Sequence, residues 1–133
     1  MNKLLDTNIL IDYFRGDKRT RKYLEMQPML VSSPIILAEL IQGARNKQEL
    51  KTLQTFQGKI YLIPFSPTLG QKMLELMKTY SFSHGLQIPD ALIAATALEE
   101  KLTLVTGNVK HFNFIKGLQI VDWQQEKKLK SSA

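Results

Sequence analysis

Short apolar segments alternate with longer segments of helical periodicity along the whole chain. The apolar segments are mostly hydrophobic and do not alternate regularly with polar residues, which is typical of strands that are covered on both faces of a parallel sheet. We therefore predict five strands, at residues 3–5, 29–31, 60–63, 102–106 and 118–121.

The segments between these strands begin with recognisable helix starts. Asp17 can cap a charged helical segment, and Ser33 and Ser66 each place a hydroxyl directly before a proline, which favours a first helical turn. The segment 89–101 is apolar for three turns and is expected to be buried on most sides. We predict helices at residues 8–14, from 17 onward, 34–43, 47–56, 67–80 and 89–101, a loop at 81–87, an irregular turn at 107–117 with one helical turn at 109–111, and a frayed basic tail at about 124–133.

This alternation of strands and helices predicts an α/β domain with a mostly parallel central sheet of about five strands flanked by helices. A length of 133 residues with 44 % hydrophobic and 23 % charged residues fits one domain, residues 1–133. Cysteine is absent, no apolar run approaches the roughly 18 residues that cross a bilayer, and the N-terminus is not a secretory signal. We predict a cytoplasmic protein without a membrane partner.

Three carboxylates stand where an acid is unexpected. Asp6 follows the first strand, at the sheet edge where α/β proteins bind ligands, although it could serve only as a helix cap. Glu39 lies within an apolar helical segment, where it either borders a cavity or forms a buried ion pair with Arg45 or a distant lysine. Asp90 opens the apolar helix, where the helix dipole alone would favour an acid.

These acids have a common explanation if they converge on one point. Their mutual repulsion would then require a divalent cation, and a ligand set of oxygen atoms without cysteine favours Mg²⁺ or Mn²⁺. His84 and His111 have no metal-ligand spacing and are expected to be surface residues. A hard cation of this kind fits phosphodiester hydrolysis, because it polarises the phosphoryl oxygen and acidifies a bound water.

The net charge of +6 favours a polyanionic partner such as nucleic acid, although a solubilising surface charge is the simpler alternative. Phe112 and Phe114 could stack on bases, but anchoring an irregular loop is the simpler role for them. The candidates for contacts with RNA phosphates are Arg15, Arg19, Lys22 and Lys110.

Four motifs resemble the PIN-domain nucleases, and within them the VapC toxins of type II toxin–antitoxin pairs: LLDTNILI, ILAELIQGA, IPDALIAATAL and LVTGNVKHF. The resemblance covers nearly the whole chain and implies a three-layer sandwich with acids clustered at one sheet edge. It implies that Asp6, Glu39 and Asp90 bind the metal. Thr7, Asn8 and Thr106 would support them, with Asn8 hydrogen-bonded to the first acid, and Asn108 would stand where many members have a further catalytic acid.

The resemblance also implies an activity and partners. The chain would be a Mg²⁺- or Mn²⁺-dependent endoribonuclease that cleaves single-stranded regions of RNA. A small antitoxin would cover its active site, and a homodimer or a toxin–antitoxin hetero-oligomer is expected. The alternatives are a housekeeping PIN nuclease in RNA processing, a phosphotransferase or phosphatase that is phosphorylated on Asp6, and a non-catalytic RNA- or protein-binding module.

Overall fold

The computed structural model of the chain describes the backbone of residues 2–131 and the side chains of residues 2–129. Its centre is a five-stranded sheet in the order β3-β2-β1-β4-β5, and every pair of neighbouring strands is parallel. The predicted α/β architecture is therefore confirmed. The strands are β1 (Lys3–Leu5), β2 (Val31–Ser32), β3 (Tyr61–Leu62), β4 (Thr103–Thr106) and β5 (Ile120–Asp122).

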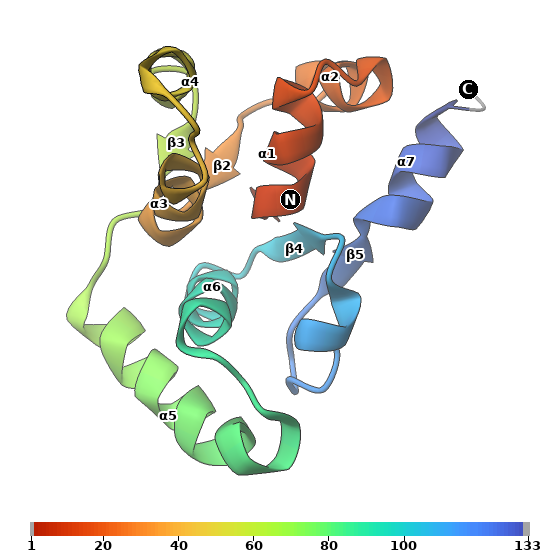
Figure 1. Cartoon of the computed structure of the whole chain (residues 1–133). Coiled ribbons are helices and arrows are strands. Elements are labelled where there is room, and N and C mark those ends of the chain that lie inside the picture. Colours follow the sequence, from red (N-terminus) through yellow and green to blue (C-terminus); the bar gives the residue numbers. More distant parts are fainter. Residues whose placement is uncertain (1, 132–133) are drawn as a thin grey trace.

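Helices lie on both sides of this sheet. In Figure 1, α1, α2 and α7 lie above β4, and α5 and α6 lie below it. None of the helices in the described part of the chain is both long and apolar enough to cross a membrane. The helices are α1 (Thr7–Phe14), α2 (Lys18–Glu25), α3 (Pro34–Gln42), α4 (Lys47–Gln57), α5 (Pro67–His84), α6 (Ile88–Glu99), the short 3₁₀ helix η1 (Val109–His111) and α7 (Trp123–Ser131).

The core lies where the two central strands meet the helix α6. Leu4 and Leu104, which are partners in the register of β1 and β4, are fully buried. Ile93 and Ala94 of α6 are also almost completely inaccessible, so the prediction that this helix is buried on most sides is confirmed. Burial of apolar surface around β1 and β4 therefore fixes the strand end that carries Asp6 and the neighbouring strand end that carries Thr106.

Most element boundaries differ from the predictions by one or two residues, and the end of α5 and the start of β2 differ most instructively. The helix α5 continues to His84, so the predicted loop at 81–87 is wrong for its first four residues. The helix ends at Gly85, whose φ of 65° lies in the left-handed region that glycine adopts without strain. The second strand begins at Val31 and leaves Met29, which the prediction had included, 54 % exposed.

The C-terminal segment also differs from its prediction. In place of a frayed tail from about residue 124, the chain forms α7 up to Ser131, and residues 132–133 lie outside the described residues. The buried Trp123 donates from Nε1 to Asp12 Oδ2 at 3.0 Å, and Lys127 donates from Nζ to the same oxygen at 2.8 Å. Side chains four residues apart share one face of a helix, so a single carboxylate on α1 holds the first turns of α7.

Candidate active site

Asp6 lies at the carboxyl end of the sheet, directly after β1 and beside the end of β4. Its N–H donates to the carbonyl of Val105 at 3.1 Å, which continues the ladder by one residue. Its side chain is 4 % exposed. Oδ1 accepts from the N–H of Thr7 at 2.7 Å, and Oδ2 accepts from the hydroxyl of Thr106 at 2.7 Å. Residues from opposite ends of the chain thus hold both oxygens of this carboxylate.

The alternative role foreseen for Asp6, as a helix cap, is also present. Asp6 is the N-cap residue of α1 through its bond from Thr7. A serine or asparagine would satisfy the same N–H without a buried charge. Burial instead raises the pKa of the Asp6 carboxyl, and the hydrogen bonds from Thr106 and Thr7 only partly offset that rise. Capping therefore does not account for a carboxylate at this position.

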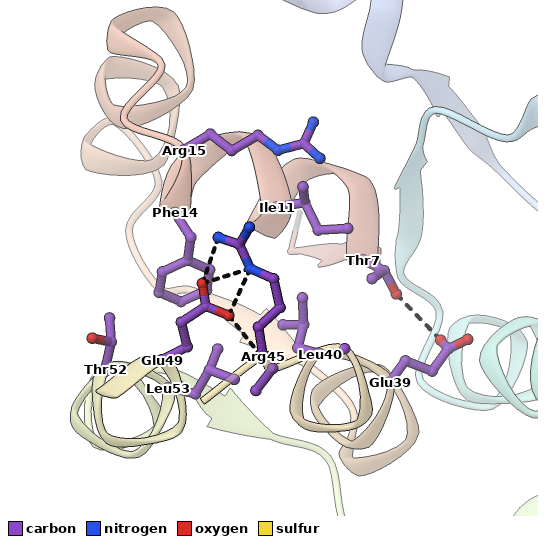
Figure 2. A pocket seen from close by; sticks show the side chains of 12 residues that line it. Thr7, Ile11, Phe14, Arg15, Glu39, Leu40, Arg45, Glu49, Thr52 and Leu53 are labelled. Atoms are coloured by element: carbon purple, nitrogen blue, oxygen red, sulfur yellow. Dashed lines mark hydrogen bonds and ion pairs between the residues drawn. The ribbon is translucent and has the colours of Figure 1, made fainter. Parts of the chain in front are cut away.

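Glu39, in the middle of α3, faces the same edge. The hydroxyl of Thr7 donates to its Oε1 at 3.2 Å. Burial raises the pKa of Glu39, and the negative charges of Asp6 and Asp90 raise it further. The alternative of an ion pair with Arg45 is wrong, because Arg45 pairs with Glu49 at 2.7 Å. Figure 2 shows these two ion-pair partners well away from the Glu39 carboxylate.

Asp90 lies in the first turn of α6, and the imidazole ring of His111 lies beside its carboxylate. His111 Nδ1 is 3.3 Å from Asp90 Oδ2. Burial raises the pKa of Asp90, the His111 ring partly offsets this, and the charge of Asp6 adds to the rise. His111 is exposed, as predicted, but it lies against a candidate acid, which the prediction missed. Its place in the loop after β4, at the ligand-binding edge of the sheet, was the signal that could have revealed it.

The three acids are therefore close enough for their charges to interact, although they are not arranged as a complete set of metal ligands. Across the described side chains, no group of three or more histidine or acidic residues is arranged so that it could hold a metal ion as it stands. The chemistry of the donors nevertheless fits a hard cation, because Asp6 and Glu39 receive bonds only from N–H and hydroxyl groups.

Asn8 does not support Asp6 in the way that the resemblance implied. Its Oδ1 accepts from the N–H of Gly107 at 2.8 Å, so it ties α1 to the loop after β4. A Cβ atom on Gly107 would lie 3.2 Å from both Asn8 Cγ and Gln124 Nε2, which explains the absence of a side chain there. Asn108 donates its N–H to the Thr106 hydroxyl at 3.0 Å, and its side chain forms no cap bond.

A groove of about 510 Å³ opens on the Glu39 side of the acids, between α1, α3 and α4. Figure 2 shows Thr7 and Glu39 at one end of this groove and the Arg45–Glu49 pair at the other. Its apolar lining residues are Ile11, Phe14, Leu40, Gly43, Ala44 and Leu53.

A smaller cavity of about 110 Å³ lies on the other side of the acids, against Asp90. It is formed where the end of α5 and the start of α6 meet the 3₁₀ turn η1. Its lining is mixed in chemistry and consists of His84, Gly85, Leu86, Gln87, Asp90, Lys110, His111 and Phe114.

Of the four basic residues that were predicted to contact RNA, two lie beside the acids and two do not. Arg15 lines the groove and Lys110 lines the cavity, so these two flank the acids. Arg19 lies 3.7 Å from Asp17, and Lys22 lies in the last turn of α2; neither lines the groove or the cavity. Phe112 is fully buried and anchors its loop, as its simpler alternative predicted.

Known proteins resemble the chain over nearly its full length. Ribonuclease VapC19 of Mycobacterium tuberculosis is 30 % identical over 122 residues, which cover 88 % of this chain and 97 % of that protein. A tRNA(fMet)-specific endonuclease VapC of Shigella flexneri is 30 % identical over 133 residues, which cover 90 % of this chain and 96 % of that protein. The crystal structure of VapBC2 from Rickettsia felis, bound to a DNA fragment from their promoter, matches with a TM-score of 0.79 and 32 % identity over 92 % of this chain and 99 % of that chain.

The match to a family description agrees with these relatives. The PIN domain family matches residues 3–115, which include all three candidate acids and the loop after β4. The predicted resemblance is thereby confirmed, and the chain belongs to the PIN domain family.

Proposed function

We propose that the chain is a divalent-metal-dependent endoribonuclease and the toxin of a toxin–antitoxin pair. The observation that carries the proposal is the electrostatic coupling of Asp6, Glu39 and Asp90 at the sheet edge, in a chain whose relatives are named ribonucleases. A phosphotransferase phosphorylated on Asp6 is disfavoured, because both oxygens of that carboxylate already accept hydrogen bonds inside the fold.

Asp6, Glu39 and Asp90 are the residues that would hold Mg²⁺ or Mn²⁺, which, when bound, neutralises phosphate charge and acidifies water. Thr7 and Thr106 fix the Asp6 carboxylate, and Thr7 also orients Glu39. One of these carboxylates would assist deprotonation of the attacking water.

The proposed partners follow from the relatives and from the groove. Solved relatives include toxin–antitoxin complexes of Klebsiella pneumoniae and Rickettsia felis. An antitoxin segment with apolar side chains would find a matching surface in the groove, and it would end beside Glu39. We propose that the chain acts in the cytoplasm on single-stranded RNA, and that it assembles as a homodimer or with its antitoxin.

The test is cleavage of a labelled single-stranded RNA with Mg²⁺, with Mn²⁺ and with EDTA. Cleavage should require metal, and Asp90→Asn should abolish it. Glu99→Gln is the matched control, because Glu99 is an exposed acid at the other end of the same helix. Cleavage that persists in EDTA, or in Asp90→Asn at the wild-type rate, would contradict the proposal.

Metal binding can be measured separately from cleavage by thermal unfolding. A cation that binds only the folded chain stabilises it by about 2.7 kcal/mol at one hundred times its dissociation constant. The melting temperature of the wild type should therefore rise with Mn²⁺, and the rise should be lost in Asp90→Asn. An equal rise in both proteins would place the cation elsewhere. Growth arrest on expression, relieved by co-expression of the cognate antitoxin, would separate a toxin from a housekeeping nuclease.

A further inference from the structure

We propose that the small cavity beside Asp90 and its exposed rim form a subsite for one nucleotide of single-stranded RNA, next to the bond that is cleaved, with the base lying on the exposed His84 ring outside the cavity. The inference rests on the proposed ribonuclease function and adds a substrate contact on the side of the acids away from the groove. Asp90 and His111 both line the cavity, so a nucleotide bound there would adjoin the acids directly.

The first argument is a ring stack at the mouth of the cavity. The rings of His84 and Phe114 lie 4.3 Å apart with an angle of 9° between their planes. Tyr80 packs edge-on against both rings, at 5.8 Å from His84 and 5.3 Å from Phe114. His84 itself is exposed, so the stack ends in a ring that solvent reaches. Exposed rings of this kind are the surfaces on which proteins stack unpaired bases.

The orientation of the His84 ring is set before any ligand binds. Ser83 Oγ lies 2.7 Å from His84 Nδ1, and Gly85 ends the helix directly after it. Gln87 Nε2 donates to the carbonyl of Gly85 at 3.1 Å, which leaves its Oε1 available to accept from a base. The cavity therefore combines a stacking ring with a hydrogen-bond acceptor, the two contacts that single-stranded bases use.

The second argument is the charge of Lys110. This exposed residue of η1 lines the cavity and forms no ion pair with any side chain that the structure describes. Asp90, the one acid in the lining, is occupied by His111 at 3.3 Å. A free ammonium group beside a stacking ring suits the phosphate and the base of one nucleotide.

The electrostatic part of the proposal is tested by the salt dependence of binding. A fluorescent single-stranded RNA is titrated in EDTA, so that anisotropy reports binding without cleavage. Lys110→Gln should weaken binding and reduce the slope of log K against log salt by about 0.7, the value for one phosphate of a single strand. Lys116→Gln is the matched control, because it removes the same charge from an exposed position of the same loop outside the cavity. Equal slopes for the two variants would overturn the proposal.

The stacking part has a different signature. His84→Ala should weaken binding by about fivefold or more and leave the salt slope unchanged, because a base and not a phosphate loses its contact. His84→Phe should restore most of the affinity, since it keeps a ring face. Phe82→Ala, at a fully exposed position of the same helix end, should have no effect. Unchanged binding by His84→Ala, or a loss that His84→Phe does not recover, would overturn the proposal.

These tests fail independently of the proposed function. If the wild type cleaves RNA with metal but neither Lys110→Gln nor His84→Ala changes RNA binding, the proposed subsite is refuted and the proposed ribonuclease function stands. If both variants change RNA binding as expected but the wild type cleaves no RNA with either metal, the ribonuclease function is refuted and the proposed RNA-binding cavity stands.

Discussion

The groove and the cavity on the two sides of the acids differ in size and in chemistry. The groove holds about 510 Å³, and half of its lining residues are apolar, with the Arg45–Glu49 pair at the far end; its acid nearest Asp6, Glu39, receives only a hydroxyl bond. The cavity holds about 110 Å³, it is lined by rings and a lysine, and its acid, Asp90, is paired with an imidazole. An apolar peptide segment suits the first surface and a nucleotide suits the second, so one set of acids can serve a substrate and an inhibitor from opposite sides.

The largest effect is expected at Asp6, which belongs to neither region. Asp6→Asn keeps the size of the side chain but removes the charge that the proposed metal requires, so the cleavage rate should fall by roughly 10²–10³-fold or more. Initial rates on labelled RNA measure this. Binding of RNA in EDTA and binding of antitoxin should both survive, because the groove and the cavity are intact. Loss of all three properties together would indicate unfolding, and circular dichroism would identify it.

The next effect separates the two threonines that hold the acids. Thr106 is fully buried and its hydroxyl bonds to Asp6 at 2.7 Å, whereas Thr7 bonds to Glu39 at 3.2 Å beside the groove. Thr106→Val should lower the cleavage rate by about 10- to 100-fold, the usual cost of losing a group that orients a metal ligand. Thr7→Val should cost less, because its backbone N–H still holds Asp6. The reverse order in the measured rates would contradict this assignment of roles.

A smaller effect tests the groove as the antitoxin surface. Ile11→Asp places a carboxylate on the apolar lining, and covering it with an apolar segment costs about 1–3 kcal/mol, so inhibition by the cognate antitoxin should weaken by about tenfold or more. Cleavage titrated with antitoxin measures the change. Lys110→Gln is the control on the cavity side and should leave inhibition unchanged. If Lys110→Gln weakened inhibition as strongly as Ile11→Asp, the two regions would not have separate partners.

The fold was predictable because local patterns and the core agree. The strands predicted at 3–5 and 102–106 became β1 (Lys3–Leu5) and β4 (Thr103–Thr106), and the Ser33 and Ser66 caps began α3 and α5 as predicted. The C-terminal segment was not predictable, because its helix depends on contacts of Trp123 and Lys127 with Asp12, more than a hundred positions earlier in the chain.

The candidate site was predictable in its acids and less so in their partners. An acid directly after a strand, as Asp6 is, and one inside an apolar helix, as Glu39 is, indicate a sheet-edge site from local pattern alone. The bond from Thr7 to Glu39 and the contact of His111 with Asp90 depend on how α1, α3, α6 and η1 pack, which no local pattern contains. The bond of Asn8 with Gly107, in place of the bond to Asp6 that the resemblance implied, depends on packing in the same way, because Gly107 is 99 positions away.

The smallest expected effect is on stability, and it arises from the negative charges of Glu39 beside the groove and Asp90 beside the cavity. The pKa values of Glu39 and Asp90 are both raised from ordinary values of 4.5 and 3.8, so in metal-free buffer each carboxyl holds its proton more tightly in the folded chain than in the unfolded one. A raised carboxyl pKa means that stability falls as pH rises from the ordinary value through the raised one. Removing either charge should therefore stabilise the folded chain at pH 7.

The two gains should differ, because the surroundings of the two acids differ. His111 and the start of α6 partly compensate Asp90, whereas Glu39 receives only the Thr7 hydroxyl. Glu39→Gln should therefore raise the free energy of unfolding at pH 7, on the order of 1 kcal/mol, and by more than Asp90→Asn does. Urea unfolding in EDTA at pH 7 and at pH 3 measures both. The gains should vanish at pH 3, where the carboxyls are protonated in both states, and a gain that persists there would show that lost charge is not its cause.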